Sequence, residues 1–209
     1  MKITFDPAGL SSVRQAKQSV SMARQVETQV GPFGNGAKLA SGNDRSAGCD
    51  VAWQVFFPVE INNIFWNDVY FAFASLMLPK LGKLIPTNSS LRLALGAGCV
   101  YKDGQISEAT ACDADKISIG NKSQDSPLCF GLAQRAEVNG KPRLFPICNV
   151  AILRGETAIF KPHAGTKLFL SSEIKSGTLI SRLGPLEEFI PGSDVVYDAK
   201  TASFRHRAP

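Results

Sequence analysis

The sequence predicts a mainly β protein of the α+β class, an antiparallel β-sandwich or barrel with an N-terminal helix and one buried hydrophobic helix. Three observations predict it. A helix start signal stands near the N-terminus, a dense apolar run covers residues 61–78, and short apolar runs separated by turn residues fill the chain from residue 90 onward. With 209 residues, 44% of them hydrophobic, the chain is long enough to bury a substantial core. We expect a helical arm and glycine-rich loop over residues 1–50 and a β-rich body over 51–209.

The first predicted element is a helix over residues 7–29. Asp6 is a suitable N-cap, Pro7 suits the first helical position, and no helix breaker follows until Gly31 and Pro32. Small apolar residues recur at a spacing of three to four and form a narrow stripe; they are Val13, Ala16, Val20, Ala23 and Val30. Because this stripe is too thin to hold a core, we expect the helix to lie on the body of the protein or against a neighbouring subunit.

Residues 31–50 are rich in glycine and predict a long loop. They contain no phosphate-binding motif, so a connector is the favoured interpretation. Long ordered loops often have a function, and together with the helix this one is expected to reach a neighbouring subunit. The interaction residues predicted on these two segments are Val13, Arg14, Lys17, Val20, Arg24 and Phe33.

Two apolar segments follow the loop. Residues 51–59 alternate with a period of two, which predicts a strand with one buried face. Residues 61–78 carry a helical apolar stripe that ends at Pro79, and they predict the buried helix. The aromatic density of this run also fits a wide strand pair or a subunit interface. Its apolar part is shorter than a bilayer requires, so no membrane contact is expected.

The remaining chain predicts a series of strands with tight turns between them. The candidate strands are residues 91–95, 99–102, 116–119, 128–138, 143–153, 157–161, 166–170, 178–182 and 195–197. Asn139 and Gly140 predict a hairpin with a type I′ turn, and residues 102–105 predict a second turn. The hairpin brings Cys129 and Cys148 onto adjacent strands, where a disulfide would need a bulge near Pro142 to adjust the register.

The chain offers little that points to catalysis. It has two histidines, His163 and His206, and no cysteine or histidine pair with metal-ligand spacing, so we expect no catalytic, cofactor or metal site. Its five cysteines are an odd number without a C-x-x-C motif, which indicates free thiols in a reducing compartment. The carboxylates at 113, 115, 187 and 188 fall in predicted solvated turns.

Nucleic-acid binding is the leading alternative. The chain carries 23 Lys and Arg against 18 Asp and Glu, a net charge of +5 that is spread along its length. Near its end, Phe204 stands beside Arg205 and Arg207, a combination that can stack on a base and hold phosphates. These three residues are therefore the predicted nucleic-acid contact. A small enzyme without a recognisable motif is the second alternative.

Three segments between residues 155 and 180 carry a resemblance to a known family. Gly155 leads one predicted strand, residues 165–171 have the pattern G-x-x-L-F-L-S, and residues 177–179 have the pattern G-x-L. In these patterns the chain resembles virion β-barrel proteins of tailed phages, of the capsid decoration or cement type. The resemblance implies a non-enzymatic structural and assembly role through self-association, as a homo-oligomer, or through binding to a capsid or tail lattice. It implies a location in the virion after assembly in the cytoplasm, in line with the absence of a predicted signal peptide.

Overall fold

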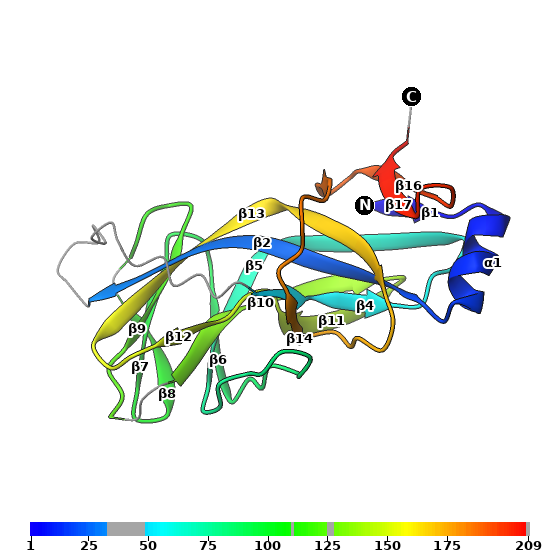
Figure 1. Cartoon of the computed structure of the whole chain (residues 1–209). Coiled ribbons are helices and arrows are strands. Elements are labelled where there is room, and N and C mark those ends of the chain that lie inside the picture. The colour runs from blue at the N-terminus through cyan, green and yellow to red at the C-terminus, as the bar shows by residue number, and fades with distance from the viewer. Residues whose placement is uncertain (33–48, 110, 125–127, 208–209) are drawn as a thin grey trace.

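The computed structural model describes residues 1–32, 49–109, 111–124 and 128–207. These residues form seventeen strands and one helix, and the sheets are curled into a half-barrel (Figure 1). The predicted mainly β class with an N-terminal helix is confirmed. The expected antiparallel arrangement holds only in part, because two strand pairs, β1 with β16 and β7 with β9, are parallel.

The larger sheet has eight strands, arranged around the two long strands β5 and β10. Along its main path the order is β11 (Lys141–Pro146), β10 (Leu128–Val138), β5 (Ile61–Ser75), β1 (Lys2–Thr4), β16 (Asp194–Asp198) and β17 (Ser203–His206). Two further strands pair beside this path, β12 (Val150–Ile152) with β10 and β6 (Ser89–Leu93) with β5.

The second sheet has seven strands and is built on the long antiparallel pair of β2 and β13. Its order is β4 (Gln54–Phe56), β2 (Ser19–Pro32), β13 (Glu156–Ser171), β9 (Ile117–Asn121), β7 (Gly98–Lys102) and β8 (Gln105–Ala109), and β15 (Glu188–Phe189) also pairs with β13. A separate ribbon joins β14 (Thr178–Ser181) to β3 (Cys49–Ala52).

The helix predicted over residues 7–29 is confirmed only over its first nine residues and is wrong beyond them. Helix α1 covers only Pro7–Gln15, starting at Asp6, whose carboxylate accepts a hydrogen bond from the Gly9 amide at 2.7 Å. Lys17 then takes a left-handed conformation with φ of 52°, and the chain continues as β2. Strand pairing with β13 over residues 19–32 overrides the helical spacing, so this part of the predicted arm is integral to a sheet.

The predicted buried helix over residues 61–78 is also wrong, because Ile61–Ser75 form strand β5. This strand pairs with β10 along one edge and with β1 and β6 along the other. Its last third is apolar on both faces since both faces are covered: Ala72 and Ala74 belong to the main core, while Phe73 belongs to a second cluster with Val51 and Leu179. A strand covered on both faces has a nearly continuous apolar run, which removes the period-two signal.

Both predicted turns are confirmed. Asn139 and Gly140 have φ values of 50° and 77°, and Val138 pairs with Lys141 across them. Asp103 and Gly104 close the hairpin between β7 and β8 in the same way. These positive φ values are those of type I′ turns, whose twist matches that of the flanking strands.

One hydrophobic cluster forms the main core and takes side chains from both large sheets. Met22 and Phe160 enter it from the second sheet, and Ile64 and Leu132 enter it from the larger sheet. All four side chains are fully buried. Helix α1 adds Val13 to the same cluster. The core therefore joins the N-terminal segment to the rest of the chain in one unit.

Candidate functional site

A long apolar groove lies on the outer face of the larger sheet. Its floor contains Phe71 and Phe73 of β5 and Ala133 of β10, which stand on the face opposite to the main core. One side is formed by residues 77–87, which follow β5, and the other by residues 144–146 with 176 and 177. The groove has a volume of about 740 Å³. This volume lies within the range of clefts that bind ligands in proteins.

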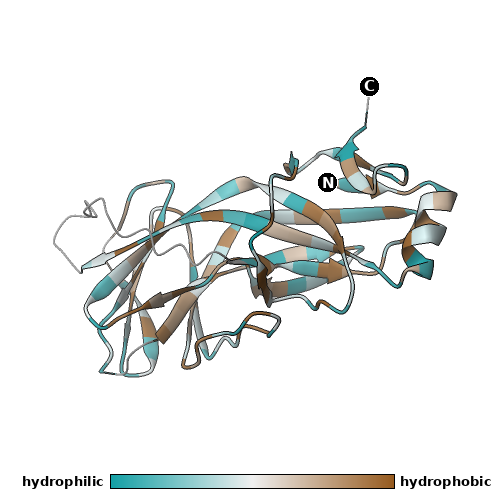
Figure 2. Ribbon diagram, viewed as in Figure 1, coloured by the Kyte–Doolittle hydropathy of each residue, from teal (hydrophilic) through white to brown (hydrophobic). Residues whose placement is uncertain are grey.

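Residues 76–84, which we call the leucine loop, leave an unusual amount of apolar surface in solvent. Met77 is 67% exposed and Leu81 is 57% exposed, and three further large apolar side chains of the loop are also exposed; these are Leu76, Leu78 and Leu84. Figure 2 shows brown stretches along this loop, which lies below β14. A contiguous exposed apolar patch with methionine and leucine side chains is typical of a protein contact surface.

The leucine loop is held by regular backbone hydrogen bonds. The Gly82 amide donates to the Leu179 carbonyl at 2.7 Å, the Leu179 amide donates to the Lys83 carbonyl at 3.0 Å, and the Ile85 amide donates to the Gly177 carbonyl at 3.0 Å. Ile85 is buried and anchors the end of the loop. Because the loop pairs with β14 in this way, its exposed side chains are presented in a set geometry before any partner binds, which lowers the entropic cost of binding.

The charged groups at the groove have one sign. Lys80 and Lys83 are its only charged lining residues, and neither pairs with a carboxylate among the described residues. Both are exposed, so their ammonium groups flank an apolar surface. An apolar segment that carries carboxylates complements this arrangement.

A buried cation lies between the sheets, away from the groove. Arg24 of β2 is 2% exposed, and its guanidinium carbon lies 5.6 Å from the ring centroid of Trp53 and 5.6 Å from that of Trp66. The two indole rings are perpendicular to each other. Stacking of a guanidinium on indole rings replaces part of the hydration that burial removes. The Arg24 guanidinium also donates to the His163 carbonyl, which β13 exposes where its register with β2 shifts.

Burial decides the electrostatics of this interior cluster. It lowers the pKa of Arg24, while Tyr70, Asp68 and Glu188 oppose that effect. It also raises the pKa of Tyr70 to about 12. Arg24 Nε and Nη1 lack a hydrogen-bond partner among the described residues, as do both side-chain polar atoms of Gln54. The contact of Arg24 with Trp66 links β2 of the second sheet to β5 of the larger sheet.

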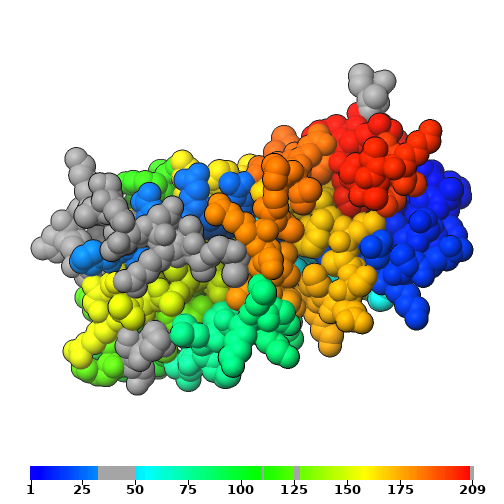
Figure 3. Space-filling view, viewed as in Figure 1, coloured from blue at the N-terminus to red at the C-terminus, as the bar shows by residue number. Residues whose placement is uncertain are grey.

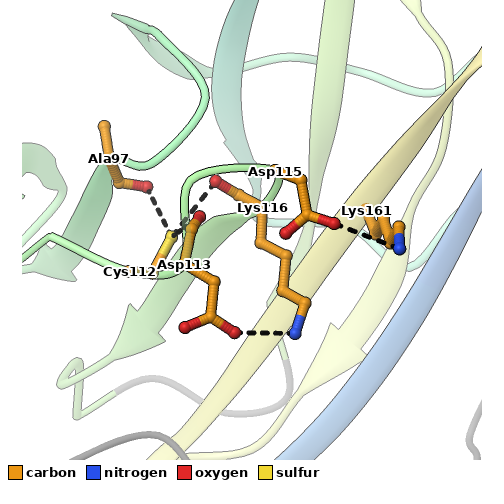
Figure 4. A network of polar contacts seen from close by, with 6 residues as sticks. All are labelled: Ala97, Cys112, Asp113, Asp115, Lys116 and Lys161. Carbon is orange, nitrogen blue, oxygen red and sulfur yellow. Dashed lines mark hydrogen bonds and ion pairs between the residues drawn. The ribbon is translucent and has the colours of Figure 1, made fainter.

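The four cysteine side chains that the structure describes are poorly suited to nucleophilic chemistry. Burial raises the pKa of Cys99, Cys129 and Cys148 to about 12, and Cys129 and Cys148 are free rather than paired. A thiol with such a pKa is protonated at neutral pH, and the thiolate is the reactive form. Cys112 donates from its thiol to the Lys116 carbonyl at 3.1 Å and to the Ala97 carbonyl at 3.3 Å (Figure 4).

The carboxylates beside Cys112 are paired at the surface. Asp113 lies 2.8 Å from the Lys116 ammonium, and Asp115 lies 3.1 Å from that of Lys161 on β13 (Figure 4). The bond from Lys161 lowers the pKa of Asp115. Both carboxylates are more than half exposed, which agrees with the solvated turn predicted for them. The contacts close this loop onto β13.

The predicted interaction residues do not form one surface. Three of them, Val13, Val20 and Arg24, are buried within the chain, so their assignment as outward contacts is wrong. The reason is that β2 is a strand, whose inner face carries Val20, Met22 and Arg24 in alternation. Arg14 and Lys17 are exposed, and Phe33 lies outside the described residues.

The prediction that Phe204 contacts nucleic acid is wrong, because its side chain is buried. Phe204 is 7% exposed and packs against Phe5 and Tyr197, so it offers no free face to a base. Strand β17 holds it there by pairing with β16. The two arginines remain exposed and pair with carboxylates of that neighbouring strand, Arg205 with Asp198 at 3.4 Å and Arg207 with Asp194 at 3.6 Å.

Within the described part of the chain, no group of three or more His, Cys, Asp or Glu side chains is arranged to hold a metal ion. Its single helix, α1, has nine residues, and no helix there has the length and apolar character needed to cross a membrane.

Comparison with known proteins gives no match: no family model, no curated protein and no solved structure is significantly similar to this chain.

Sequence reasoning missed the groove and the leucine loop. The signal was present in the run L-M-L-P-K-L-G-K-L over residues 76–84, where apolar side chains continue past Pro79 into a segment that proline and glycine keep out of regular structure. Such a run in a loop is an exposed apolar surface unless another element covers it. Which of its side chains are covered depends on contacts with β14 and β10, which are distant in sequence.

Proposed function

We propose that this chain is a non-enzymatic assembly protein that acts by self-association or by binding to a protein lattice. The observation that supports it is the apolar groove with the exposed leucine loop along its side, held in place by bonds to β14. Burying such a surface in a protein contact is favourable, at about 25 cal/mol per Å² of apolar area. The groove replaces the N-terminal segment as the proposed contact surface.

The proposal includes a class of assembly and a scaffold. The class is a virion component of the capsid decoration type, assembled in the cytoplasm, and it is supported by the sequence resemblance over residues 155–180. The scaffold is a β-sandwich, supported by the hydrophobic cluster that takes side chains from both large sheets. In such a protein the function lies in contact surfaces on a rigid body.

The test is the solution mass of the full-length protein, measured by size-exclusion chromatography with light scattering at low and moderate salt. We expect a discrete oligomer for the wild type. Replacing two exposed side chains of the leucine loop, with Met77→Ser and Leu81→Ser, should shift the protein from the oligomer to the monomer. Both side chains are exposed in the single chain and would be buried only in the oligomer, so the substitutions weaken the contact. The matched control is Phe57→Ser, which changes a side chain that is 77% exposed and lies outside the groove.

Two outcomes would overturn the proposal. A wild type that stays monomeric at both salts and binds no protein particle would remove both modes of action. A monomer that carries nucleic acid and sheds it at moderate salt would favour the nucleic-acid-binding alternative, since phosphate contacts weaken steeply with ionic strength. Deleting residues 1–50 is not a usable test, because β1 and β2 pair within the two large sheets.

A further inference from the structure

We propose that the groove of one copy receives residues 185–191 of a second copy, which we call the acidic ridge. This inference rests on the proposed function and names the occupant of the groove. The acidic ridge exposes two large apolar side chains, Leu186 at 40% and Ile190 at 56%, and carries two exposed carboxylates, Glu187 and Glu188. The acidic ridge therefore combines exposed apolar side chains with the acidic groups that the groove lining lacks.

Charge complementarity selects this segment. The groove is flanked by Lys80 and Lys83 and has no acidic residue among the described residues that line it, while the ridge has two adjacent carboxylates. Two basic groups beside an apolar floor match two acidic groups between apolar side chains. Among the described residues, residues 57–61 form a second exposed apolar segment, but it carries one carboxylate, Glu60, and so matches the pair of lysines less well.

Backbone hydrogen bonds hold the acidic ridge in place, as they hold the leucine loop. Phe189 is buried at its centre, and β15 pairs Phe189 with Thr166 of β13. The Ser193 amide donates to the Ile190 carbonyl at 3.1 Å and closes the turn that follows. Glu187 lies 3.6 Å from the His206 ring nitrogen, at the exposed surface, where such a pair is weak and leaves the carboxylate available. Little order is lost when a segment held in this way binds.

The positions of the two surfaces decide the kind of assembly. Figure 3 shows the green-teal leucine loop at the lower edge of the molecule, and the orange chain between β14 and β16 reaches the upper edge. One copy therefore uses different surfaces toward its two neighbours. Such a head-to-tail contact closes into a ring or continues as a filament, depending on the rotation between copies.

The test exchanges the charges of the two surfaces in separate variants of the full-length protein. One variant carries Lys80→Glu and Lys83→Glu in the groove, and the other carries Glu187→Lys on the ridge; Glu188 is kept because its charge also acts on the buried Arg24. Each variant alone places like charges across the contact and should raise the dissociation constant about tenfold or more. In an equimolar mixture, the acidic groove of the first variant meets the lysine introduced on the ridge of the second, and the wild-type pairing remains at the other contact. We therefore expect the mixture to recover the wild-type mass in light scattering.

The outcomes separate this inference from the proposed function. If the wild type assembles and the leucine-loop variant does not, but the charge variants assemble like the wild type, the groove is a contact surface and the ridge is not its occupant. Two charge variants that each dissociate and fail to recover on mixing also overturn the inference. A wild type that is monomeric at all concentrations overturns it as well. Leu186→Ser with Ile190→Ser, compared with Phe57→Ser, tests the apolar half in the same assay.

Discussion

Substituting Gly131 by alanine should destabilise the protein strongly, because strand β10 passes close to two other parts of the chain at this residue. A Cβ atom added at Gly131 would lie 2.1 Å from the carbonyl oxygen of Cys148 and 2.8 Å from the ring of Phe73. Phe73 is fully buried and forms part of the groove floor. The contact with Cys148 involves backbone, which a side-chain rotation cannot relieve.

The size of the effect follows from these distances. Carbon atoms pack best at about 3.5–4.0 Å, so the Phe73 ring would have to withdraw by about 0.7 Å. The Cys148 carbonyl would have to move further, although the amides of Ile147 and Cys148 both donate to Leu132 next to the substitution. Overpacking in a well-packed core costs about 1–3 kcal/mol and occasionally more, and with two obstacles we expect at least about 3 kcal/mol. For a chain of this length, that lowers Tm by about 6–12 °C.

The assay is denaturation by urea, followed by tryptophan fluorescence, since Trp53 is fully buried in the native state. The matched control is Gly184→Ala, because a Cβ there meets nothing within 4 Å and the backbone needs no positive φ. It should change the free energy of unfolding by no more than about 0.5 kcal/mol. A loss below about 1 kcal/mol for Gly131→Ala would refute the close approach of β10 to Cys148.

Four further predictions concern the interior and one turn. Arg24→Met should leave the protein about 2 kcal/mol more stable than Arg24→Ala, because both remove the buried charge and only the alanine leaves a cavity between the indole rings; equal midpoints in urea would contradict this. Native Cys99, Cys129 and Cys148 should resist iodoacetamide at pH 7.5 and react after unfolding, and labelling of the folded protein at the rate of a free thiol would contradict the raised pKa. The pKa of each of these thiols rises from 9.0 to about 12 on folding, so the unfolded chain loses these protons at lower pH than the folded protein does. The free energy of unfolding should therefore be unaffected below pH 9 and should fall between pH 9 and 12 by up to about 1.4 kcal/mol per pH unit per thiol. Urea denaturation across that pH range measures this effect. Gly140→Ala should cost about 1 kcal/mol by the same assay, since φ is 77° there and no side chain is in the way, and no loss would rule out the type I′ turn.

The local signals in the sequence were reliable where a few neighbouring residues decide the structure. Asn139-Gly140 predicted a type I′ hairpin, and Asp6 with Pro7 predicted the start of α1, because turn and cap geometry depend on side chains within three residues. The segment over residues 128–138 was predicted as a strand with the bounds that β10 has. The strands predicted at 157–161 and 166–170 are one strand, β13, which continues through an irregularity after Pro162.

The two helix predictions failed because several periods fit the same residues. In β2, Val20, Ala23 and Val30 match a helical spacing, while Val20, Met22 and Val26 match a strand, and the choice was made by β13, more than a hundred residues away. Pairing of β2 and β13 satisfies backbone groups over both strands, which local helix propensity does not outweigh. In β5, cover on both faces removed the alternation that would have marked a strand.

The mainly β class and the tight turns could be predicted from the sequence, since they follow from composition and from interactions between near neighbours in the chain. The tertiary structure decided which apolar residues stay in solvent. Met77 and Leu81 are exposed whereas Phe73 and Ile85 are buried, although all four belong to one apolar stretch. The difference is made by β10 and β14, which cover only part of this stretch, and burial by distant segments leaves no local pattern in the sequence.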